Sequence, residues 1–291
     1  MSINRLIILL LIIMIALSGC SNVESNNSLE NESAKNVERK SPVKEMKEDI
    51  EGPSKQNKSI VDTSGWFKVR GPVHIPILMY HSISTGNNSL YVPKDQFREQ
   101  MTWLKDNGYY TLSPEEAYDV LTQGKKPRKK IILVTFDDGY LDNFTNAYPI
   151  LRKYGMKATI FMIGRSIDKQ NHLTKQQMKE MSQHGISIES HTINHLQLSQ
   201  LPAEQQRNEM VQSKALYNKM LNQNTILLCY PFGSYNNETL KLAKETGYKM
   251  AVTTEPGAAS RDQGLYALHR IRISPGMSIQ GFGRIVDNAN Q

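Results

Sequence analysis

The sequence predicts an α/β fold whose parallel strands close into a barrel. Short apolar runs rich in β-branched residues alternate with longer segments whose apolar residues recur at helical spacing. Buried strands separated by amphipathic helices are typical of a parallel sheet that helices cover. Because about seven such units follow one another, we expect the sheet to close on itself rather than remain open.

The expected strands are the short apolar runs. The first, 75–83, reads IPILMYHSI and is apolar over most of its length. The second, 129–136, reads KKIILVTF and runs directly into two carboxylates. We expect the remaining strands at 158–164, 186–190, 225–230, 249–253 and 269–273.

The expected helices lie between these strands. In 93–109 the residues Phe97, Met101 and Leu104 recur at helical spacing. SPEE at 113–116 has the pattern of a capping box with proline in the first turn, so a second helix should begin there. We expect further helices at 143–154, 174–184, 202–222 and 238–246.

The chain opens with a hydrophobic segment that has the features of an export signal. Arg5 precedes an unbroken apolar run over 6–17, and small residues follow up to Cys20. The run is shorter than the roughly 20 apolar residues that a membrane span needs. LSGC resembles the bacterial lipobox, which implies cleavage before Cys20 and attachment of lipid to its thiol. The alternative is an uncleaved anchor, and in both cases the chain is tethered to the extracytoplasmic face of the cell membrane.

Composition divides the chain into three parts. Residues 1–19 form the expected lipoprotein signal peptide, and 20–64 is rich in Asn, Ser, Glu and Lys with few aromatic residues. Such a segment cannot bury enough apolar surface to order itself, so we interpret 20–64 as a disordered, flexible tether. Residues 65–291 have the length of one large α/β domain. A lipid on Cys20 would leave Cys229, the other of the two cysteines, without a disulfide partner.

The charge balance favours some partners over others. The formal net charge is +7, and the charges are spread along the chain. For an exported protein this fits a negatively charged cell envelope better than a nucleic acid. The sequence shows no basic patch interleaved with aromatic residues, so we expect no nucleic-acid partner.

Polar residues with catalytic potential follow several of the expected strands. His81 follows the first strand, Asp137 and Asp138 follow the second, and His191 follows the strand at 186–190. In α/β barrels the working groups lie at the carboxyl ends of the strands. We therefore expect these side chains to meet at one end of the barrel.

Two adjacent carboxylates at the end of a buried strand indicate a nearby cation. Asp137 and Asp138 repel each other, and carboxylates are seldom buried unless they are paired or bound to a cation. His191 and His195 in HTINH would share one face of a helix or helical turn and could bind one ion. Two histidines and one aspartate leave coordination positions open for water and substrate. The other aspartate would be free to take a proton from water.

Three motifs resemble those of a known family. TFDDG at 135–139, HTINH at 191–195 and YPFG at 230–233 look like the first three motifs of the polysaccharide deacetylases, the NodB-homology domain of carbohydrate esterase family 4. The resemblance covers about 75–273, nearly all of the expected domain. It implies a distorted (β/α) barrel and an enzyme that hydrolyses N-acetyl groups of amino sugars.

The resemblance also implies roles for individual residues. Asp137 would be the general base, and Asp138, His191 and His195 would bind a divalent metal, which we expect to be Zn²⁺. The metal would activate water and polarise the acetyl carbonyl. The backbone N–H of Phe232 would stabilise the resulting oxyanion.

The chain departs from the family pattern at Cys229. Many members have an arginine at this position, which orients the base, and a cysteine cannot replace it. Arg270 and Arg272, on the last expected strand, are candidates for reaching the same carboxylate. We expect Cys229 itself to be a small buried residue.

The general acid is the second departure, because an amine leaving group needs a proton. Members commonly supply a histidine from a late LxH motif, which His269 superficially fits. MYHSI at 79–83, however, resembles the branch that acts on poly-β-1,6-N-acetylglucosamine, in which the first strand supplies the acid. We therefore expect His81, which directly follows a buried run, to be the acid rather than His269.

These observations lead to one expected function and several alternatives. We expect a membrane-tethered, metal-dependent hydrolase, acting as a monomer, that removes N-acetyl groups from an extracellular N-acetylglucosamine polymer. Poly-β-1,6-N-acetylglucosamine, a polymer suited to a biofilm, is favoured, and peptidoglycan is the first alternative. A non-catalytic glycan-binding protein is the second, although it would not need the complete set of aspartates and histidines. A non-haem iron oxygenase also uses two histidines and one carboxylate, but it does not predict a second aspartate.

Overall fold

The fold comes from a computed structural model that describes residues 63–290. The expected signal peptide (1–19) and nearly all of the expected tether (20–64) lie outside the described residues, so both stay predictions. Within the described part, no helix combines the length and the apolar character that crossing a bilayer requires.

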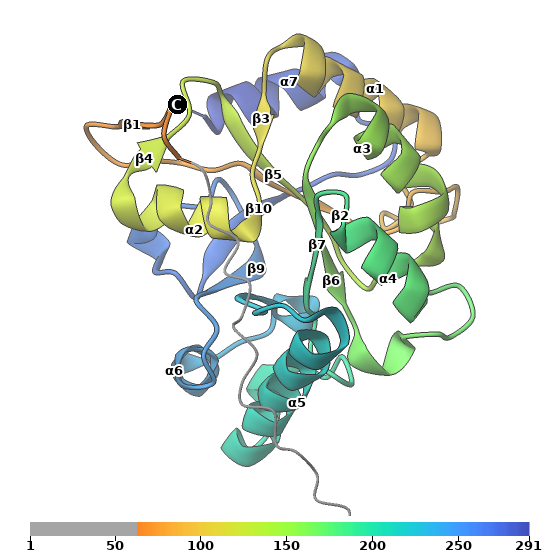
Figure 1. Ribbon diagram of the computed structural model, residues 1–291, viewed down its shortest axis with the longest axis vertical. Coiled ribbons are helices and arrows are strands. Elements are labelled where there is room, and N and C mark those ends of the chain that lie inside the picture. The colour runs from red at the N-terminus through yellow and green to blue at the C-terminus, as the bar shows by residue number, and fades with distance from the viewer. Residues whose placement is uncertain (1–62, 291) are drawn as a thin grey trace, which may run out of the picture. The chain divides into compact units, whose positions relative to one another are not determined.

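Seven parallel strands form a closed ring within residues 63–290, as the sequence predicts (Figure 1). The ring closes at β2 (Ile77–Tyr80), which pairs with β10 (Leu268–Arg272) on one side and with β5 (Ile131–Phe136) on the other. The remaining strands follow from β10 in the order β9 (Met250–Pro256), β8 (Leu227–Cys229), β7 (Ile186–Ser190) and β6 (Ala158–Met162). The prediction of a closed barrel is confirmed.

The ring is distorted between β7 and β8. Ser190 and Leu228 are the one pair recorded between these strands. The buried carboxylate of Glu189 instead accepts hydrogen bonds from the backbone N–H groups of Ile226 and Leu227, at 2.9 and 2.7 Å. A side chain thus satisfies backbone groups that would otherwise be buried without partners where the strands spread apart.

In the part of the chain that the structure describes, three very short strands lie outside the ring, and the sequence analysis did not predict them. β3 (Tyr110–Thr111) adds to the first half of β5. β1 (Phe67–Lys68) pairs antiparallel with β4 (Lys125–Lys126). Two residues are too few to show an alternating pattern, so only the tertiary structure reveals these pairings.

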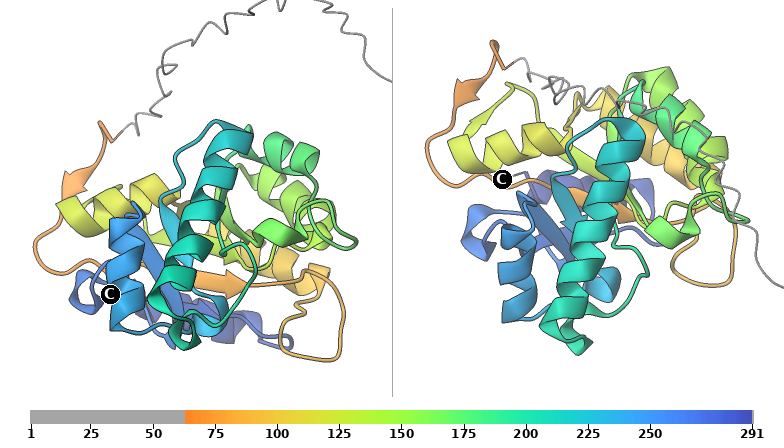
Figure 2. Two further views of the ribbon diagram at one scale, coloured as in Figure 1. Left: turned by 90° about the horizontal axis from the view of Figure 1, so that it is seen from below. Right: turned by 60° about the horizontal axis from the view of Figure 1, so that its bottom comes forward.

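Helices surround the ring, and Figure 2 shows them on its outside from two further directions. The α-helices of the described part are α1 (Lys94–Asp106), α2 (Pro114–Gln123), α3 (Tyr148–Tyr154), α4 (Lys175–Ser182), α5 (Ala203–Leu221), α6 (Asn237–Glu245) and α7 (Ile279–Asn288). A π-helical turn, η1 (Asn143–Ala147), precedes α3. The predicted capping box of α2 is confirmed, because Ser113 and Glu116 each bond the backbone N–H of the other.

The last helix, α7, is absent from the sequence-based prediction. It contains Gly281 and Gly283, and glycine is a poor helix former. A Cβ atom added to Gly283 would lie 2.6 Å from the Trp103 ring, so this glycine allows α7 to lie close against α1. Phe282 packs edge-on against the same ring, with centroids 5.8 Å apart. Packing on α1, rather than local propensity, decides this helix.

The barrel strands separate two apolar layers. Ile77, Leu133 and Leu268 belong to the cluster that fills the interior. Their neighbours Leu78 and Val134 belong to the cluster between the strands and the helices, as alternation along a strand requires. The polar residues at the carboxyl ends of the strands therefore lie next to a largely apolar interior.

Candidate active site

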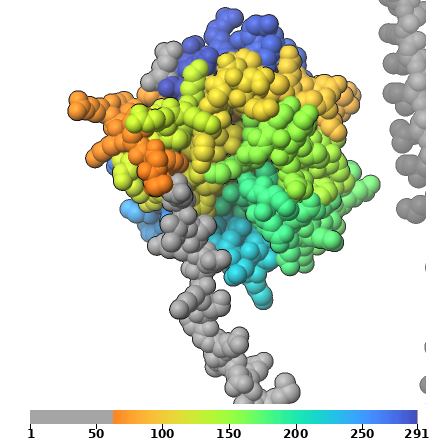
Figure 3. All heavy atoms as spheres, turned by 45° about the horizontal axis from the view of Figure 1, so that its top comes forward, coloured from red at the N-terminus to blue at the C-terminus, as the bar shows by residue number. Residues whose placement is uncertain are grey.

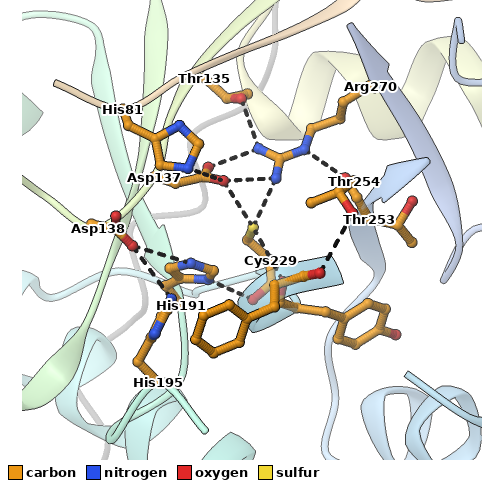
Figure 4. A network of polar contacts seen from close by, with 12 residues as sticks. His81, Thr135, Asp137, Asp138, His191, His195, Cys229, Thr253, Thr254 and Arg270 are labelled. Carbon is orange, nitrogen blue, oxygen red and sulfur yellow. Dashed lines mark hydrogen bonds and ion pairs between the residues drawn. The ribbon is translucent and has the colours of Figure 1, made fainter. Parts of the chain in front are cut away.

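The carboxyl ends of the strands bring together the polar residues singled out in the sequence (Figure 4). His81 follows β2, Asp137 and Asp138 follow β5, and His191 follows β7. Cys229 is the last residue of β8. The structure therefore places residues from four strands around one point.

Arg270 of β10 holds the carboxylate of Asp137. Its Nη1 and Nη2 atoms donate to Oδ1 and Oδ2 of Asp137, each at 2.7 Å. The Arg270 side chain is 0% exposed and that of Asp137 is 4% exposed. Arg270 also donates to the backbone oxygen of Thr253 at 2.8 Å and to Oγ1 of Thr135 at 3.2 Å. A bidentate pair of this kind fixes the orientation of the carboxylate as well as its charge.

Cys229 lies against this ion pair. Its Sγ atom is 3.2 Å from Nη2 of Arg270 and 3.6 Å from Oδ2 of Asp137. Burial raises the pKa of the thiol well above its ordinary value, so the thiol is neutral. The sequence left open whether Arg270 or Arg272 reaches the base, and the structure selects Arg270, because Arg272 is exposed.

The surroundings of Asp137 keep it ionised. Burial alone would raise the pKa of this carboxyl, but the Arg270 guanidinium outweighs that effect and holds the pKa well below its ordinary value. His81 completes the group, with Nε2 3.8 Å from Oδ2 of Asp137. Burial lowers the pKa of His81, and the Asp137 carboxylate opposes this shift.

Asp138, His191 and His195 form a second cluster beside the first. Oδ1 of Asp138 lies 3.5 Å from Nε2 of His191 and 3.4 Å from Nε2 of His195. One ligand atom from each residue lies within 4.8 Å of the others. Ligands about 2.1 Å from a tetrahedral zinc are about 3.4 Å from one another, so this spacing fits a single ion.

The orientation of His191 also suits a metal ligand. Its Nδ1 lies 2.8 Å from the backbone oxygen of Cys229. This bond requires the proton on Nδ1, so Nε2, which lies 3.5 Å from Oδ1 of Asp138, keeps a free lone pair for a metal. Burial lowers the pKa of His191 to about 4, so the imidazole is neutral, as a ligand must be.

HTINH is a loop, and the expectation of a helix or helical turn is wrong. Thr192 and His195 have φ angles of 63° and 57°, which interrupt any right-handed helical path. Glu209 of α5 shapes the loop, because its carboxylate accepts bonds from the backbone N–H groups of Ile193 and Asn194, at 3.0 and 2.8 Å. The Asn194 side chain donates to it at 2.6 Å. The two imidazoles therefore meet because the loop folds back, with ring centroids 4.7 Å apart.

Phe232 lies at the surface beside the second cluster. Its ring centroid is 4.6 Å from that of His195, and the residue is 60% exposed. Its backbone is in the left-handed region, with φ 59° and ψ 9°. A Cβ atom added to Gly233 would lie 2.1 Å from Oγ1 of Thr254, so this tight turn requires glycine.

His269 lies away from the cluster. It stands between Leu268 and Arg270 in β10, and both neighbours face the barrel interior. Alternation along the strand therefore directs His269 outward. His81 is the histidine that the structure places beside Asp137.

Two supporting residues escaped the sequence analysis. Thr135 is buried inside TFDDG, donates to the backbone oxygen of Leu78 at 2.7 Å and accepts from Arg270. A hydroxyl in an otherwise apolar strand was the available signal for it. Glu209 lies in the polar sequence of α5, where nothing distinguishes it from its neighbours.

Comparison with known proteins places this site in a family. The family model "Polysaccharide deacetylase" matches residues 124–251. YxkH of Bacillus subtilis (strain 168), named as a polysaccharide deacetylase, is 56% identical over 274 residues, which cover 94% of each chain. A poly-β-1,6-N-acetyl-D-glucosamine N-deacetylase of Staphylococcus epidermidis is 30% identical over 219 residues, covering 68% of this chain and 74% of that protein.

Solved structures lead to the same family. Deacetylase PplD of Streptococcus pyogenes, in complex with acetate, has a TM-score of 0.73 and 45% identity, covering 74% of this chain and 99% of that chain. A polysaccharide deacetylase of Bacillus cereus, BC0361, has a TM-score of 0.67 and 31% identity, covering 74% of this chain and 69% of that chain. IcaB of Ammonifex degensii shares the fold, with a TM-score of 0.66 at 22% identity, covering 77% of this chain and 100% of that chain.

The site and these relatives define a class of enzyme. The chain belongs to the polysaccharide deacetylase family. It is a hydrolase that removes acetyl groups from a polysaccharide, so the alternatives of a non-catalytic binding protein and of an oxygenase are set aside. Enzymes of this family depend on a metal, and the described residues offer a set of ligands that fits one.

Proposed function

We propose that this deacetylase acts on N-acetylglucosamine polymers and that poly-β-1,6-N-acetylglucosamine is its favoured substrate. The observation that carries the proposal is the position of His81, at the end of the first barrel strand and 3.8 Å from Asp137. A histidine from this strand is the feature that MYHSI shares with the branch acting on this polymer. The Staphylococcus epidermidis relative, whose name states this substrate, supports the same assignment.

The proposal gives a role to Asp137, Phe232 and His81. Asp137, ionised and oriented by Arg270, is the general base that takes a proton from the attacking water. The Phe232 N–H donates to the acetyl oxygen as it gains negative charge. His81 is the general acid that protonates the departing amine. Its protonated form is favoured by Asp137 and opposed by burial.

The second cluster would hold a zinc ion. Asp138, His191 and His195 are the proposed ligands, and their spacing and the orientation of His191 fit the ion. When bound, zinc supplies Lewis-acid chemistry, which polarises the acetyl carbonyl and makes water more acidic. The residues of the first cluster then move the protons.

We also propose where the enzyme works. LSGC at 17–20 resembles a lipobox, which supports an enzyme anchored through Cys20 at the extracytoplasmic face of the membrane. We propose further that it acts there as a monomer. Each acetyl group removed leaves an ammonium group, and a more cationic exopolysaccharide adheres better to an anionic envelope. Incorporation of labelled fatty acid that disappears in Cys20→Ala would test the anchor, and gel filtration of the chain from Ser21 onward would test the monomer.

Peptidoglycan is the second candidate substrate. YxkH and PplD, at 56% and 45% identity, are more similar to this chain than the Staphylococcus epidermidis enzyme is, and their names specify neither of the two candidate polymers. The fold and the two clusters suit the N-acetyl group in either polymer. The linkage between the sugars distinguishes the two candidates.

The test is acetate release by the chain from Ser21 onward, which contains the whole barrel and its apolar clusters. It is given zinc and either β-1,6-linked N-acetylglucosamine oligomers or peptidoglycan fragments of matched sugar content. Asp137→Asn, which keeps the shape of the side chain, is the control for contaminating activity. Faster release from the β-1,6 oligomers, abolished in the control, is the expected result. Release from peptidoglycan fragments alone would replace the favoured substrate with the alternative.

A further inference from the structure

A basic segment lies at the end of the barrel opposite the active site. Residues 124–130 read GKKPRKK and lead directly into the first residue of β5. Asp137 and Asp138 follow the last residue of the same strand. Six strand residues span about 20 Å, so the basic segment and the active site lie at opposite ends of the barrel.

The fold adds two more cations to this segment. β1 pairs with β4, which places Lys68 opposite Lys125. Figure 3 shows the two segments side by side on the molecular surface, with residues 63–70 in orange and the segment before β5 in yellow-green. We call the following residues the basic surface: Lys68, Arg70, Lys125, Lys126, Arg128 and Lys129. The expectation that the charges are spread along the chain is therefore wrong at this end of the barrel.

The cations of the basic surface lack carboxylate partners. Among the ion pairs of residues 63–290, none includes a member of the basic surface, whereas the neighbouring Lys130 pairs with Asp287 at 2.6 Å. All six side chains are exposed except that of Lys126, which is half-buried. Their mutual repulsion is relieved when an anionic partner binds.

An aromatic side chain lies within the basic surface. Phe67 is 37% exposed, and the Arg128 guanidinium lies over its ring, 5.6 Å from the centroid. Exposed aromatic rings beside cations are typical of proteins that lie on a bilayer, where the ring enters the interface and the cations meet phosphates. A groove of about 520 Å³, lined by Lys68, Arg261 and the single carboxylate of Asp262, adjoins it and offers space for a headgroup.

We propose that the basic surface docks onto the anionic phospholipid headgroups of the membrane to which the chain is tethered. A bilayer fits better than a soluble polyanion because a polyanion offers nothing apolar to Phe67. In the sequence, Lys68 also lies only four residues after the end of the expected tether at residue 64. The proposal rests on the proposed membrane location and adds an orientation, in which the active site points away from the bilayer towards the polymer.

Vesicle binding tests the proposal independently of the reaction. The chain from Ser21 onward, which carries no lipid, should co-sediment with phosphatidylglycerol-containing vesicles and not with pure phosphatidylcholine vesicles. Replacing Lys125, Lys126, Arg128 and Lys129 with glutamine should weaken binding about a hundredfold or more. The matched control replaces four exposed cations elsewhere with glutamine, namely Arg165, Lys169, Lys175 and Lys179. It loses the same charge and should bind much more tightly than the first variant.

A fluorescent label tests the orientation. Cys229 is fully buried, so a cysteine introduced on the surface can be labelled selectively. A polarity-sensitive dye on Phe67→Cys should brighten with anionic vesicles, whereas the same dye on Asn87→Cys, in the loop after β2, should not. The proposal would be overturned if the dye responded equally at the two positions, or if the chain bound equally to both kinds of vesicle. It would also be overturned if the two fourfold glutamine variants lost binding equally. Binding to poly(glycerol phosphate) without binding to vesicles would overturn the proposal and favour a wall polymer as the partner. None of these outcomes would change the acetate release that tests the proposed function.

Discussion

Asp137 and Asp138 are neighbours in the sequence, yet the fold gives them opposite surroundings. Asp137 receives a buried guanidinium, which holds its pKa well below the ordinary value. Asp138 faces two imidazoles, and burial raises its pKa. Asp137 is thus paired with a cation of the protein itself, whereas Asp138 is placed to bind a metal ion together with the two histidines.

This difference explains how two adjacent carboxylates can do different work. A carboxylate held by two bonds from a fixed arginine keeps its orientation and stays ionised whether or not a metal is bound. A carboxylate grouped with neutral imidazoles is completed by a divalent ion, which also holds it ionised. The following predictions test this division, from the largest expected effect to the smallest.

Replacing each aspartate should separate the two roles. Asp138→Asn should lower zinc affinity about a hundredfold or more, and acetate release should fall with it, because the single anionic ligand is lost. Asp137→Asn should retain zinc and still lose activity about a thousandfold, because the general base is gone. Calorimetric titration with zinc and acetate release measure the two properties. Equal loss of zinc in both variants would contradict the division.

Arg270→Met should lower kcat/KM about a hundredfold and move the acidic limb of its pH profile to higher pH. Without the guanidinium, burial raises the pKa of Asp137 unopposed, so the base becomes protonated at a higher pH. The variant should also lose about 3–5 kcal/mol of unfolding free energy at neutral pH, because a buried carboxylate is left unpaired.

The pH dependence of the unfolding free energy is a second test of the Arg270–Asp137 pair. In the parent chain the pair with Arg270 stabilises the fold above the ordinary aspartate pKa, and this contribution is lost as the pH falls through the lowered pKa of Asp137. The difference in unfolding free energy between the parent chain and Arg270→Met should therefore become smaller at acidic pH. Arg270→Lys, which keeps the charge without the bidentate geometry, should shift the pH profile less. A profile that does not move in either variant would show that Arg270 does not control the base.

Glu209→Gln should lower zinc affinity about tenfold to a hundredfold without moving the acidic limb of the pH profile. The Glu209 carboxylate holds the loop that carries both histidine ligands and forms no hydrogen bond or ion pair with Asp137. Glu204→Gln, an exposed change on the same helix, is the control. A shifted pH profile in Glu209→Gln would mean that the two clusters are not separable.

Cys229→Ala should have the smallest effect, about 1 kcal/mol of unfolding free energy and a few-fold change in rate. The pair of Arg270 with Asp137 does not need the thiol. Cys229→Arg should be much more harmful, because two guanidinium groups would compete for one buried carboxylate. Combining it with Arg270→Met should restore part of the lost activity. Failure of the double variant to exceed both single variants would show that position 229 cannot supply the arginine in this barrel.

Much of the fold follows from local patterns in the sequence. The runs ILMY, IILVTF and ISIES lie within predicted strands because their lengths and apolar character match buried parallel strands. The helix at Ser113 was located by its capping box. In contrast, α7 depends on the close packing of Gly283 against Trp103, and β1 and β4 form only by pairing with each other. No local sequence pattern therefore predicts these three elements.

The candidate site also combines features that the sequence predicts with features that depend on the tertiary structure. Asp137, Asp138, His191 and His195 lie in contiguous motifs at strand ends, so the sequence by itself determined that they would meet. It could not determine the shape of HTINH, since Glu209, from another helix, imposes the turn.

What the sequence by itself determined about this protein is therefore the order of its barrel strands and of the helices before α7, the end of the barrel that carries the chemistry, and the residue types gathered there. Only the tertiary structure decided which arginine gives Asp137 its internal cation. Arg270 lies 133 residues from Asp137 in the chain, and closure of the ring through β2 carries β10 close enough for the bidentate pair. A pKa depends on burial and on charges a few ångströms away, and those distances exist only once the barrel has closed.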